Sequence, residues 1–137
     1  MSCIFCKIAN GDIPADIITS DEQVIAFLDI NPSAKGHALV VPVTHVEDLT
    51  ALDDTLVSAV FSTAREVGKA LMDTLGCEGF NVIMNNGSAA GQVVFHAHTH
   101  VIPRNHDDGV MPKMARAQYA DGESAKLATT LAGHLSK

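Results

Sequence analysis

The sequence lacks the features that mark secreted, membrane-spanning and nucleic-acid-binding proteins. Its start has no basic stretch followed by an apolar core, and no apolar run approaches the length of a membrane span. Nine Lys and Arg stand against 16 Asp and Glu, and no basic run occurs that could follow a polyphosphate backbone. We therefore expect a soluble cytoplasmic protein whose partners include neither membranes nor polymeric nucleic acid.

Cysteine is also scarce, which excludes a framework of disulfides. Only three cysteines occur, the closely spaced Cys3 and Cys6 and the isolated Cys77. The pair favours metal binding. The lone Cys77 follows a predicted helix, and we expect it to be an inert, buried thiol.

The composition is that of an ordinary globular protein. Hydrophobic residues make up 47% of the chain and charged residues 18%, so it is neither disordered by composition nor a charged coiled coil. Its 137 residues fit one domain with a buried core, and no internal repeat or linker divides them. The prediction is a single domain over residues 1–137.

Short apolar stretches bounded by turn residues predict five strands. Asp21 and Glu22 should form the turn of a hairpin between the first two strands, and Pro42 should end the third or place it on an edge. The strands are expected at residues 17–19, 24–28, 37–43, 80–84 and 93–103.

Two helices are predicted from apolar residues that recur every three or four positions. The first runs from about Asp53 to Leu75, with aspartates at its N-terminal end and Gly76 placed to terminate it. The second is a shorter C-terminal helix over residues 123–135, where leucines recur every four positions.

Three alternating histidines, His96, His98 and His100, carry the strongest functional signal. On a strand, residues two apart point to one face, so the three imidazoles should lie together. Imidazole is a nucleophile, a general acid or base and a metal ligand, and such a row is therefore a chemical surface. The residues alone leave two other interpretations open, a coincidental histidine-rich edge strand and a catalytic zinc site.

The alternating histidines, preceded by Gly91 and Gln92, resemble the signature of the histidine-triad (HIT) family. The resemblance extends over residues 2–104 and includes residues 3–8, 26–30 and 36–42, His45, Asn85 and Gly87. It implies an α+β, HIT-like fold with a five-stranded antiparallel sheet, one long helix and a shorter C-terminal helix. It also implies a homodimer, in which two sheets form one ten-stranded sheet across a two-fold axis.

The resemblance assigns the chemistry to histidines. His98 would attack the α-phosphorus of a purine nucleotide and give a nucleotidyl-histidine intermediate, which water then hydrolyses. His100 would contact a phosphate oxygen or the leaving group, where an imidazolium offsets growing negative charge. The candidate catalytic residues are His98, His100, His37 and His96.

The resemblance also implies a nucleotide site. Asp29 would accept hydrogen bonds from the ribose hydroxyls, apolar side chains would enclose the base, and the amides and glycines of the loop before the triad would contact phosphate or ribose. Turn formation for Asp29 and plain core packing for the apolar residues are the competing interpretations. The candidates are Asp29, Ile30, Phe5, Ile8, Phe27, Asn85, Gly91, Gln92, His98 and His100.

A structural zinc is implied as well, on Cys3, Cys6, His45 and His96. Two thiolates and two imidazoles form a closed tetrahedral site that would attach the N-terminal segment to the sheet. His96 would then not be free for catalysis. No catalytic metal is expected.

The specific reaction stays divided between alternatives. Adenosine 5′-monophosphoramidase activity is the leading prediction, and dinucleoside polyphosphate hydrolysis is the second, because Arg104 could meet distal phosphates. Val93 stands where many family members have a hydroxyl residue, which bears on specificity for an amine leaving group. The third alternative is a nucleotide-sensing or partner-binding module with negligible turnover.

Overall fold

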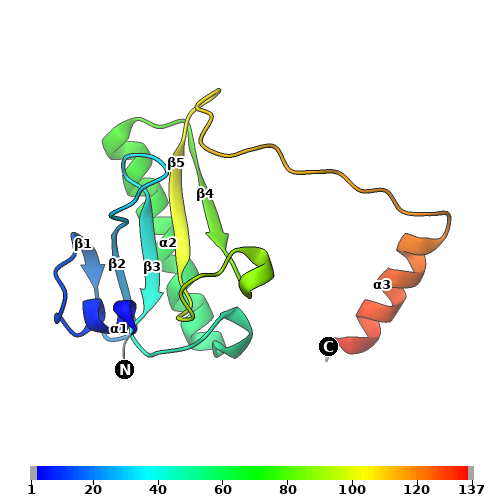
Figure 1. Cartoon of the computed structure of the whole chain (residues 1–137), viewed down its shortest axis with the longest axis horizontal. Coiled ribbons are helices and arrows are strands. Elements are labelled where there is room, and N and C mark those ends of the chain that lie inside the picture. Colours follow the sequence, from blue (N-terminus) through cyan, green and yellow to red (C-terminus); the bar gives the residue numbers. More distant parts are fainter. Residues whose placement is uncertain (1–2, 136–137) are drawn as a thin grey trace.

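The computed structural model describes residues 3–135, which form a body of sheet and helices with a C-terminal arm beside it (Figure 1). Two single 3-10 turns, Leu49–Ala51 and Ser88–Ala90, lie in the loops. The elements in chain order are α1 (Ile4–Ala9), β1 (Ile17–Ser20), β2 (Val24–Leu28), β3 (Ala38–Pro42), α2 (Asp54–Leu75), β4 (Gly79–Met84), β5 (Thr99–Arg104) and α3 (Glu123–His134).

The sheet is antiparallel throughout, with the strand order β1-β2-β3-β5-β4. Its two edges are therefore β1 and β4. The predicted α+β class, the five-stranded antiparallel sheet, the long helix and the shorter terminal helix are confirmed. The homodimer with its ten-stranded sheet involves a second chain and stays a prediction.

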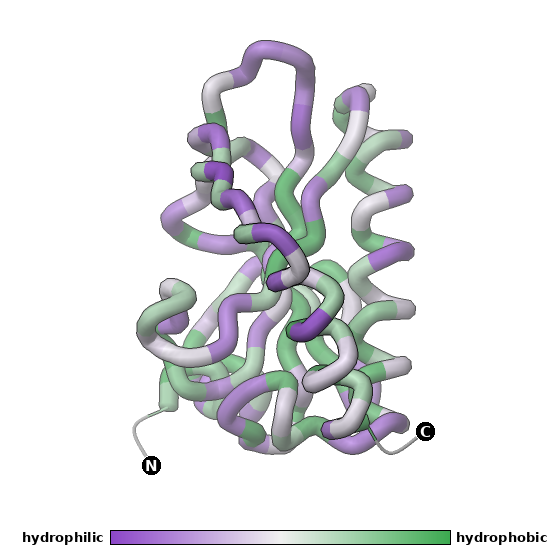
Figure 2. Tube along the Cα trace, turned by 90° about the vertical axis from the view of Figure 1, so that its right-hand side faces the viewer, coloured by the Kyte–Doolittle hydropathy of each residue, from purple (hydrophilic) through white to green (hydrophobic). Residues whose placement is uncertain are grey.

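Helix α2 covers one face of the sheet, as its apolar stripe predicts. The Asp53 side chain accepts a hydrogen bond from the Leu56 N–H at its start, and Gly76 ends it in a left-handed conformation with φ 66°. Figure 2 shows the helix standing beside the strands. The core between them consists of Val24, Ala26, Ala38, Val40, Val60, Ala64, Val67 and Val101.

The opposite face of the sheet carries α1 and a second apolar cluster. Phe5 of α1 packs there with Ile25, Phe27, Leu39 and Val41. In the register of β3 and β5, Leu39 pairs with His100, and paired residues share a face. His100 therefore lies on the α1 face, away from α2.

The strand predicted over residues 93–103 begins later than expected, because β5 starts only at Thr99. Thr99 pairs with Met84, the last residue of β4, and with Val40 of β3. Pro42, two residues beyond Val40, has no N–H with which to extend the ladder. His96 and His98 thus precede the strand, and a backbone hydrogen bond from Ala97 to Val46 (2.6 Å) holds this segment in place.

Helix α1 was not predicted, since six residues are too few to show a helical period. Cys77 is buried, as predicted. Among the residues described, no helix is both long enough and apolar enough to span a membrane.

Candidate active site and metal centre

His98 is a buried imidazole with one nitrogen already engaged. Its Nδ1 lies 2.8 Å from the backbone carbonyl oxygen of His96. A carbonyl only accepts, so Nδ1 carries the proton and Nε2 keeps its lone pair. The ring centroid lies 5.0 Å from that of Phe5 and 5.2 Å from that of His100. His98 thus has the tautomer and the restricted orientation that a nucleophile requires.

The tautomers of His37 and His100 follow from a backbone donor, the N–H of Ser33. This N–H donates to Nδ1 of His37 (3.0 Å), which leaves the proton of His37 on Nε2. His37 Nε2 in turn donates to Nδ1 of His100 at 2.9 Å. The proton of His100 is therefore on Nε2, so His100 provides an N–H donor beside the ring of His98.

Burial keeps both of these rings neutral. It lowers the pKa of His37, and burial together with the neighbouring His98 and His37 lowers the pKa of His100 to about 4. His100 is thus a neutral donor at neutral pH. The imidazolium expected from the sequence is not its resting form.

We expect this depressed pKa to make the protein less stable in mild acid. Below pH 6.5 the unfolded chain protonates His100, whereas the folded chain does so only near pH 4, so stability falls as the pH decreases through that window. The expected loss is on the order of 2 kcal/mol for a half-buried ring. Denaturant unfolding at several pH values measures this loss, and the free energy of unfolding of His100→Asn should depend less on pH. The same pH dependence in the variant and the wild type would contradict the expectation.

Asp29 lies beside this pair of histidines. Its Oδ2 is 3.7 Å from His37 Nε2, while its Oδ1 accepts a hydrogen bond from the Asn31 N–H. The turn role, which was the competing interpretation from the sequence, therefore accounts for only one carboxylate oxygen, Oδ1. The other oxygen faces the histidines.

His96 has neither ring nitrogen available for catalysis. Its Nε2 donates to the carbonyl oxygen of Pro42 (2.8 Å), and its Nδ1 faces the sulfur atoms of Cys3 and Cys6. The ring is completely buried. Its contribution to the site is the backbone carbonyl that orients His98.

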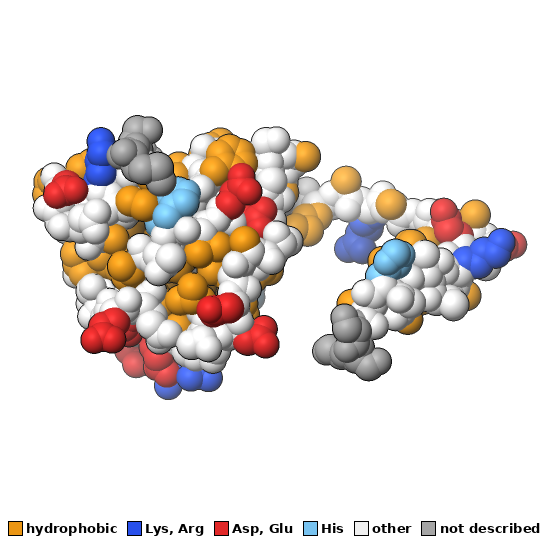
Figure 3. Space-filling view, turned by 90° about the horizontal axis from the view of Figure 1, so that it is seen from below, with side chains coloured by type: hydrophobic (Ala, Val, Ile, Leu, Met, Phe, Trp, Pro, Cys, Tyr) orange, Lys and Arg blue, Asp and Glu red, His pale blue; other side chains and the backbone are white. Residues whose placement is uncertain are grey.

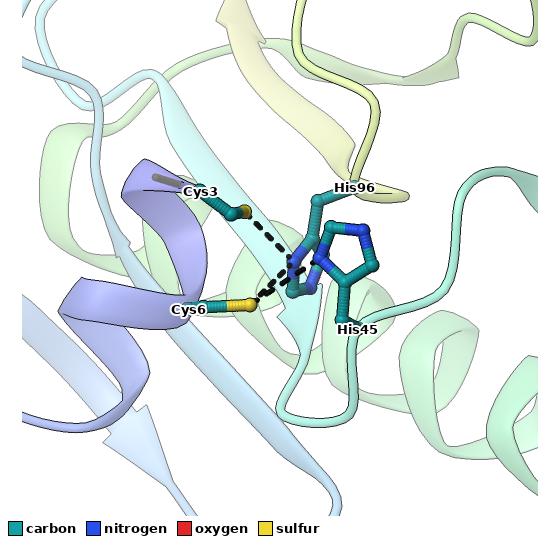
Figure 4. A group of neighbouring side chains, drawn as sticks. All are labelled: Cys3, Cys6, His45 and His96. Carbon is teal, nitrogen blue, oxygen red and sulfur yellow. Dashed lines mark hydrogen bonds between the residues drawn. The ribbon is translucent and has the colours of Figure 1, made fainter. Parts of the chain in front are cut away.

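Cys3, Cys6, His45 and His96 converge on one point, where their ligand atoms all lie within 4.8 Å of one another (Figure 4). Both cysteines project from the α1 region toward the two imidazoles. Cys3 Sγ is 3.3 Å from His96 Nδ1, and Cys6 Sγ is 3.3 Å from His45 Nδ1. Ligand atoms of a tetrahedral zinc with two sulfurs and two nitrogens are ~3.3–3.8 Å apart, so the set fits this metal.

The hydrogen bond from His96 to Pro42 supports the same fit. By carrying the proton on Nε2, His96 presents an unprotonated Nδ1 to the metal position. Ligating histidines commonly donate their other N–H to a carbonyl in this way. Pro42 had no sequence signal for this role, because only its backbone oxygen is used.

The loop before the triad is closed by Gln92. Its Oε1 accepts from the Gly87 N–H, and its Nε2 donates to the carbonyl oxygens of Glu47 and Val94. The buried amide therefore shapes the loop. Gly87 and Gly91 have φ values of 89° and 97°, which favour glycine, and Asn85 lies against Gly91.

The predicted base-enclosing residues divide into two groups. Phe5 and Phe27 are buried with ring centroids 5.9 Å apart, and Ile8 packs against the same cluster. Ile30 is 81% exposed. The structure thus brings Phe5 to the triad and leaves Ile30 at the surface.

Arg104 is held in place at the far end of β5. Its guanidinium donates to both carboxylate oxygens of Asp108 (2.9 Å each) and to Asn81 (2.6 Å). Three of its five N–H groups are thus bonded within the chain, and its charge is balanced by that of Asp108.

The chain is similar to known sequences. The family model described as "HIT domain" matches residues 10–107. A HIT-like protein of Methanocaldococcus jannaschii is 46% identical over 87% of this chain and 92% of its own length. An adenosine 5′-monophosphoramidase of Schizosaccharomyces pombe is 43% identical over 79% of this chain and 78% of its own, and an adenylylsulfatase of Arabidopsis thaliana is 34% identical over 97% and 69%.

Solved structures are also similar. A HIT family protein of Bacillus subtilis matches with a TM-score of 0.92 and 36% identity, over 100% of this chain and 99% of its own. A zinc-bound histidine triad protein of Mycobacterium smegmatis matches with a TM-score of 0.78 and 36% identity, over 98% and 99%.

Proposed function

Since the chain belongs to the HIT family, we propose that it is a hydrolase acting at the α-phosphate of purine nucleotides, with adenosine 5′-monophosphoramidates as its substrates. The observation that carries the proposal is the tautomer of His98. Its Nδ1–H is bound to a carbonyl and its Nε2 is left as a nucleophile beside the donor of His100.

The reaction would proceed in two displacements. His98 Nε2 forms a bond to the α-phosphorus while the bond from phosphorus to the leaving nitrogen breaks, and the leaving amine takes a proton from solvent. Water then attacks the nucleotidyl-imidazole and gives a proton back to solvent, which releases the nucleoside monophosphate and restores His98. Splitting the hydrolysis in this way replaces one difficult step by two easier ones.

His100 would act as a preorganised donor in both steps. Its Nε2–H points away from His37, and a non-bridging phosphate oxygen placed there would accept it. The donor is oriented before substrate binds, because the chain from Ser33 through His37 already determines where each proton lies. Such orientation avoids reorganisation during the reaction.

The nucleoside would bind beside the triad on the α1 face. Asp29 Oδ2 would accept from a ribose hydroxyl, and the apolar side chains near Phe5 and Ile8 would contact the base. Asn85 and the backbone at Gly91 would approach the phosphate from the loop. Ile30 would contact the nucleoside from the surface.

We further propose that the Cys₂His₂ set holds a structural zinc and that the protein is a cytoplasmic homodimer joined at the β4 edges. The donor geometry supports the metal, and reduced thiols suit the cytoplasm. The position of β4 at an edge of the sheet, where one side of its backbone is unpaired, supports the sheet-to-sheet contact. When bound, the zinc would attach α1 to the segment that carries His96.

Parallel turnover of adenosine 5′-phosphoramidate and diadenosine tetraphosphate tests the proposed activity. We expect the phosphoramidate to be cleaved at least about tenfold faster, because the charge of Arg104 is already balanced by Asp108 and attracts distal phosphates less strongly. Preference for the dinucleotide would move the assignment to polyphosphate hydrolysis. Binding of AMP without turnover of either substrate would favour a sensing module.

A further inference from the structure

The C-terminal arm, residues 111–135, does not pack on the core of its own chain. Every residue from 112 to 135 is exposed, although the arm contains a regular helix of 12 residues, α3. Leu127 and Leu131 lie on one side of it and Leu135 follows at its C-terminal cap, and these three leucines, the leucine stripe, are 44–66% exposed. Nothing in the proposed reaction uses this segment.

An isolated helix of this length is unstable in water. Helices shorter than about 12–15 residues are marginal alone, and in proteins they are held by packing of an apolar face. The N-cap residue of α3 is Gly122, which provides no side-chain cap, and none of its residues is buried. The leucine stripe therefore requires a surface on another molecule.

The arm leads past the β4 edge of the sheet. Figure 1 shows the extended segment after β5 running beyond β4 and α3 standing apart from the body, and Figure 3, from below, shows the same separation. The connecting residues 105–122 can span up to ~60 Å when extended. A second sheet placed at the β4 edge would be ~24 Å wide for five strands, so α3 can reach its far side.

The position of the arm also recurs in the similar Bacillus subtilis protein. Residues 111–135 make up about a fifth of the chain, and the high TM-score over the whole chain could not be reached if the arm lay elsewhere. An extended arm held at one place in a crystal structure of a relative indicates a built feature of the fold.

The body offers a groove that fits α3. Between β1 and α2, an apolar groove is lined by Ile18, Leu28, Val67, Ala70, Leu71 and Leu75. It continues along α2 toward Ser62, since the adjoining hollow shares Ile18, Val67 and Ala70. From Ser62 to Leu75 the groove is ~20 Å long, and a 12-residue helix measures ~18 Å.

The groove and the arm lie at opposite ends of the molecule. The groove adjoins β1, and the arm passes β4, which is the other edge of the sheet. In the structure α3 does not fold back to the groove of its own chain. A second copy joined at β4 would carry its own groove at the far edge of its sheet, and residues 105–122 are long enough for α3 to reach it.

We propose that α3 docks in the β1–α2 groove of a second copy of this chain, so that two copies exchange their C-terminal arms. The exchange buries the leucine stripe and the groove together and places no demand on the catalytic chemistry. It rests on the proposed homodimer joined at the β4 edges, whereas the proposed reaction does not depend on it.

Disulfide trapping between two differently tagged chains tests the exchange. One chain carries Ala70→Cys, at an exposed position in the groove, and the other carries Leu131→Cys on the leucine stripe. The two chains are co-expressed, and both are loaded with zinc. We expect a covalent dimer that contains both tags, and reduction should remove it. Each variant expressed alone gives the background from the native cysteines.

Thr129→Cys serves as the matched control, since residue 129 points to the opposite side of α3 from residue 131. It should cross-link at least about tenfold less than Leu131→Cys. Equal yields for the two variants, or a link that forms only within one chain carrying both cysteines, would overturn the proposal.

Hydrogen exchange provides a second readout that needs no new cysteine. Residues 124–133 should exchange at least about tenfold faster in Ala70→Arg than in the wild type, because the larger cation blocks the groove. Exchange at the rate of an unstructured chain in the wild type itself would overturn the docked arm.

Discussion

We expect the His98→Ala variant to hydrolyse adenosine 5′-phosphoramidate at least about a thousandfold more slowly than the wild type. The substitution removes a ring nitrogen that has a fixed orientation and whose lone pair, unlike that of His96 Nδ1, is not directed at the proposed metal position. His100 cannot replace it, since its Nδ1 accepts from His37 and its Nε2 carries the proton. Steady-state turnover measures the loss.

The matched control is His106→Ala. His106 is a surface histidine whose contacts are to Glu78, so its removal should leave turnover within about twofold of the wild type. AMP binding by calorimetry should survive in His98→Ala, because the proposed ribose and base contacts remain. A loss of less than about tenfold in a folded His98→Ala protein would remove His98 from the role of nucleophile.

Local sequence signals predicted the elements that depend on local physics. The stripe from Leu56 to Leu75, with Asp53 before it and Gly76 after it, specified α2 almost to the residue. The hairpin at Asp21 formed as expected, since its carboxylate accepts from the N–H groups of Gln23 and Val24. Each of these features is decided by neighbours in the chain.

The start of β5 could not be predicted in the same way. Residues 93–98 alternate like a strand, but whether they pair depends on β3 and β4, which lie elsewhere in the sequence. Pro42 and the end of β4 at Met84 set the limit. The three imidazoles nevertheless gather, because Phe5 contacts both His96 and His98, and His98 contacts His100.

The parts of the site made by backbone atoms had no sequence signal. The N–H of Ser33, the carbonyl of Pro42 and the carbonyl of His96 together determine the tautomers of four histidines, His100 through His37. Any residue, apart from proline at the first position, supplies the same atoms. Side-chain identities therefore predict which rings are present, whereas the positions of their protons require the fold.

Removing the metal ligands should have the largest effect on stability. We expect the double substitution Cys3→Ser and Cys6→Ser to lower the free energy of unfolding by about 3 kcal/mol or more, and the melting temperature by about 10 °C. Helix α1 has six residues, no side-chain N-cap and one buried residue, Phe5, so little else holds it. Thermal unfolding, with the zinc content measured on the same samples, tests this expectation.

The same substitution should also slow the reaction without abolishing it. Phe5 lies between the two cysteines and packs on the ring of His98, and the carbonyl that orients this ring belongs to His96, a proposed ligand. Loss of the metal loosens both supports but leaves the nucleophile in place, so we expect about a ten- to a hundredfold lower kcat. Cys77→Ala is the control, because this buried thiol lies outside the metal set and should keep the zinc and the rate. If the double variant lost its zinc but kept both its melting temperature and its kcat, the metal would have no part in holding α1 against the triad.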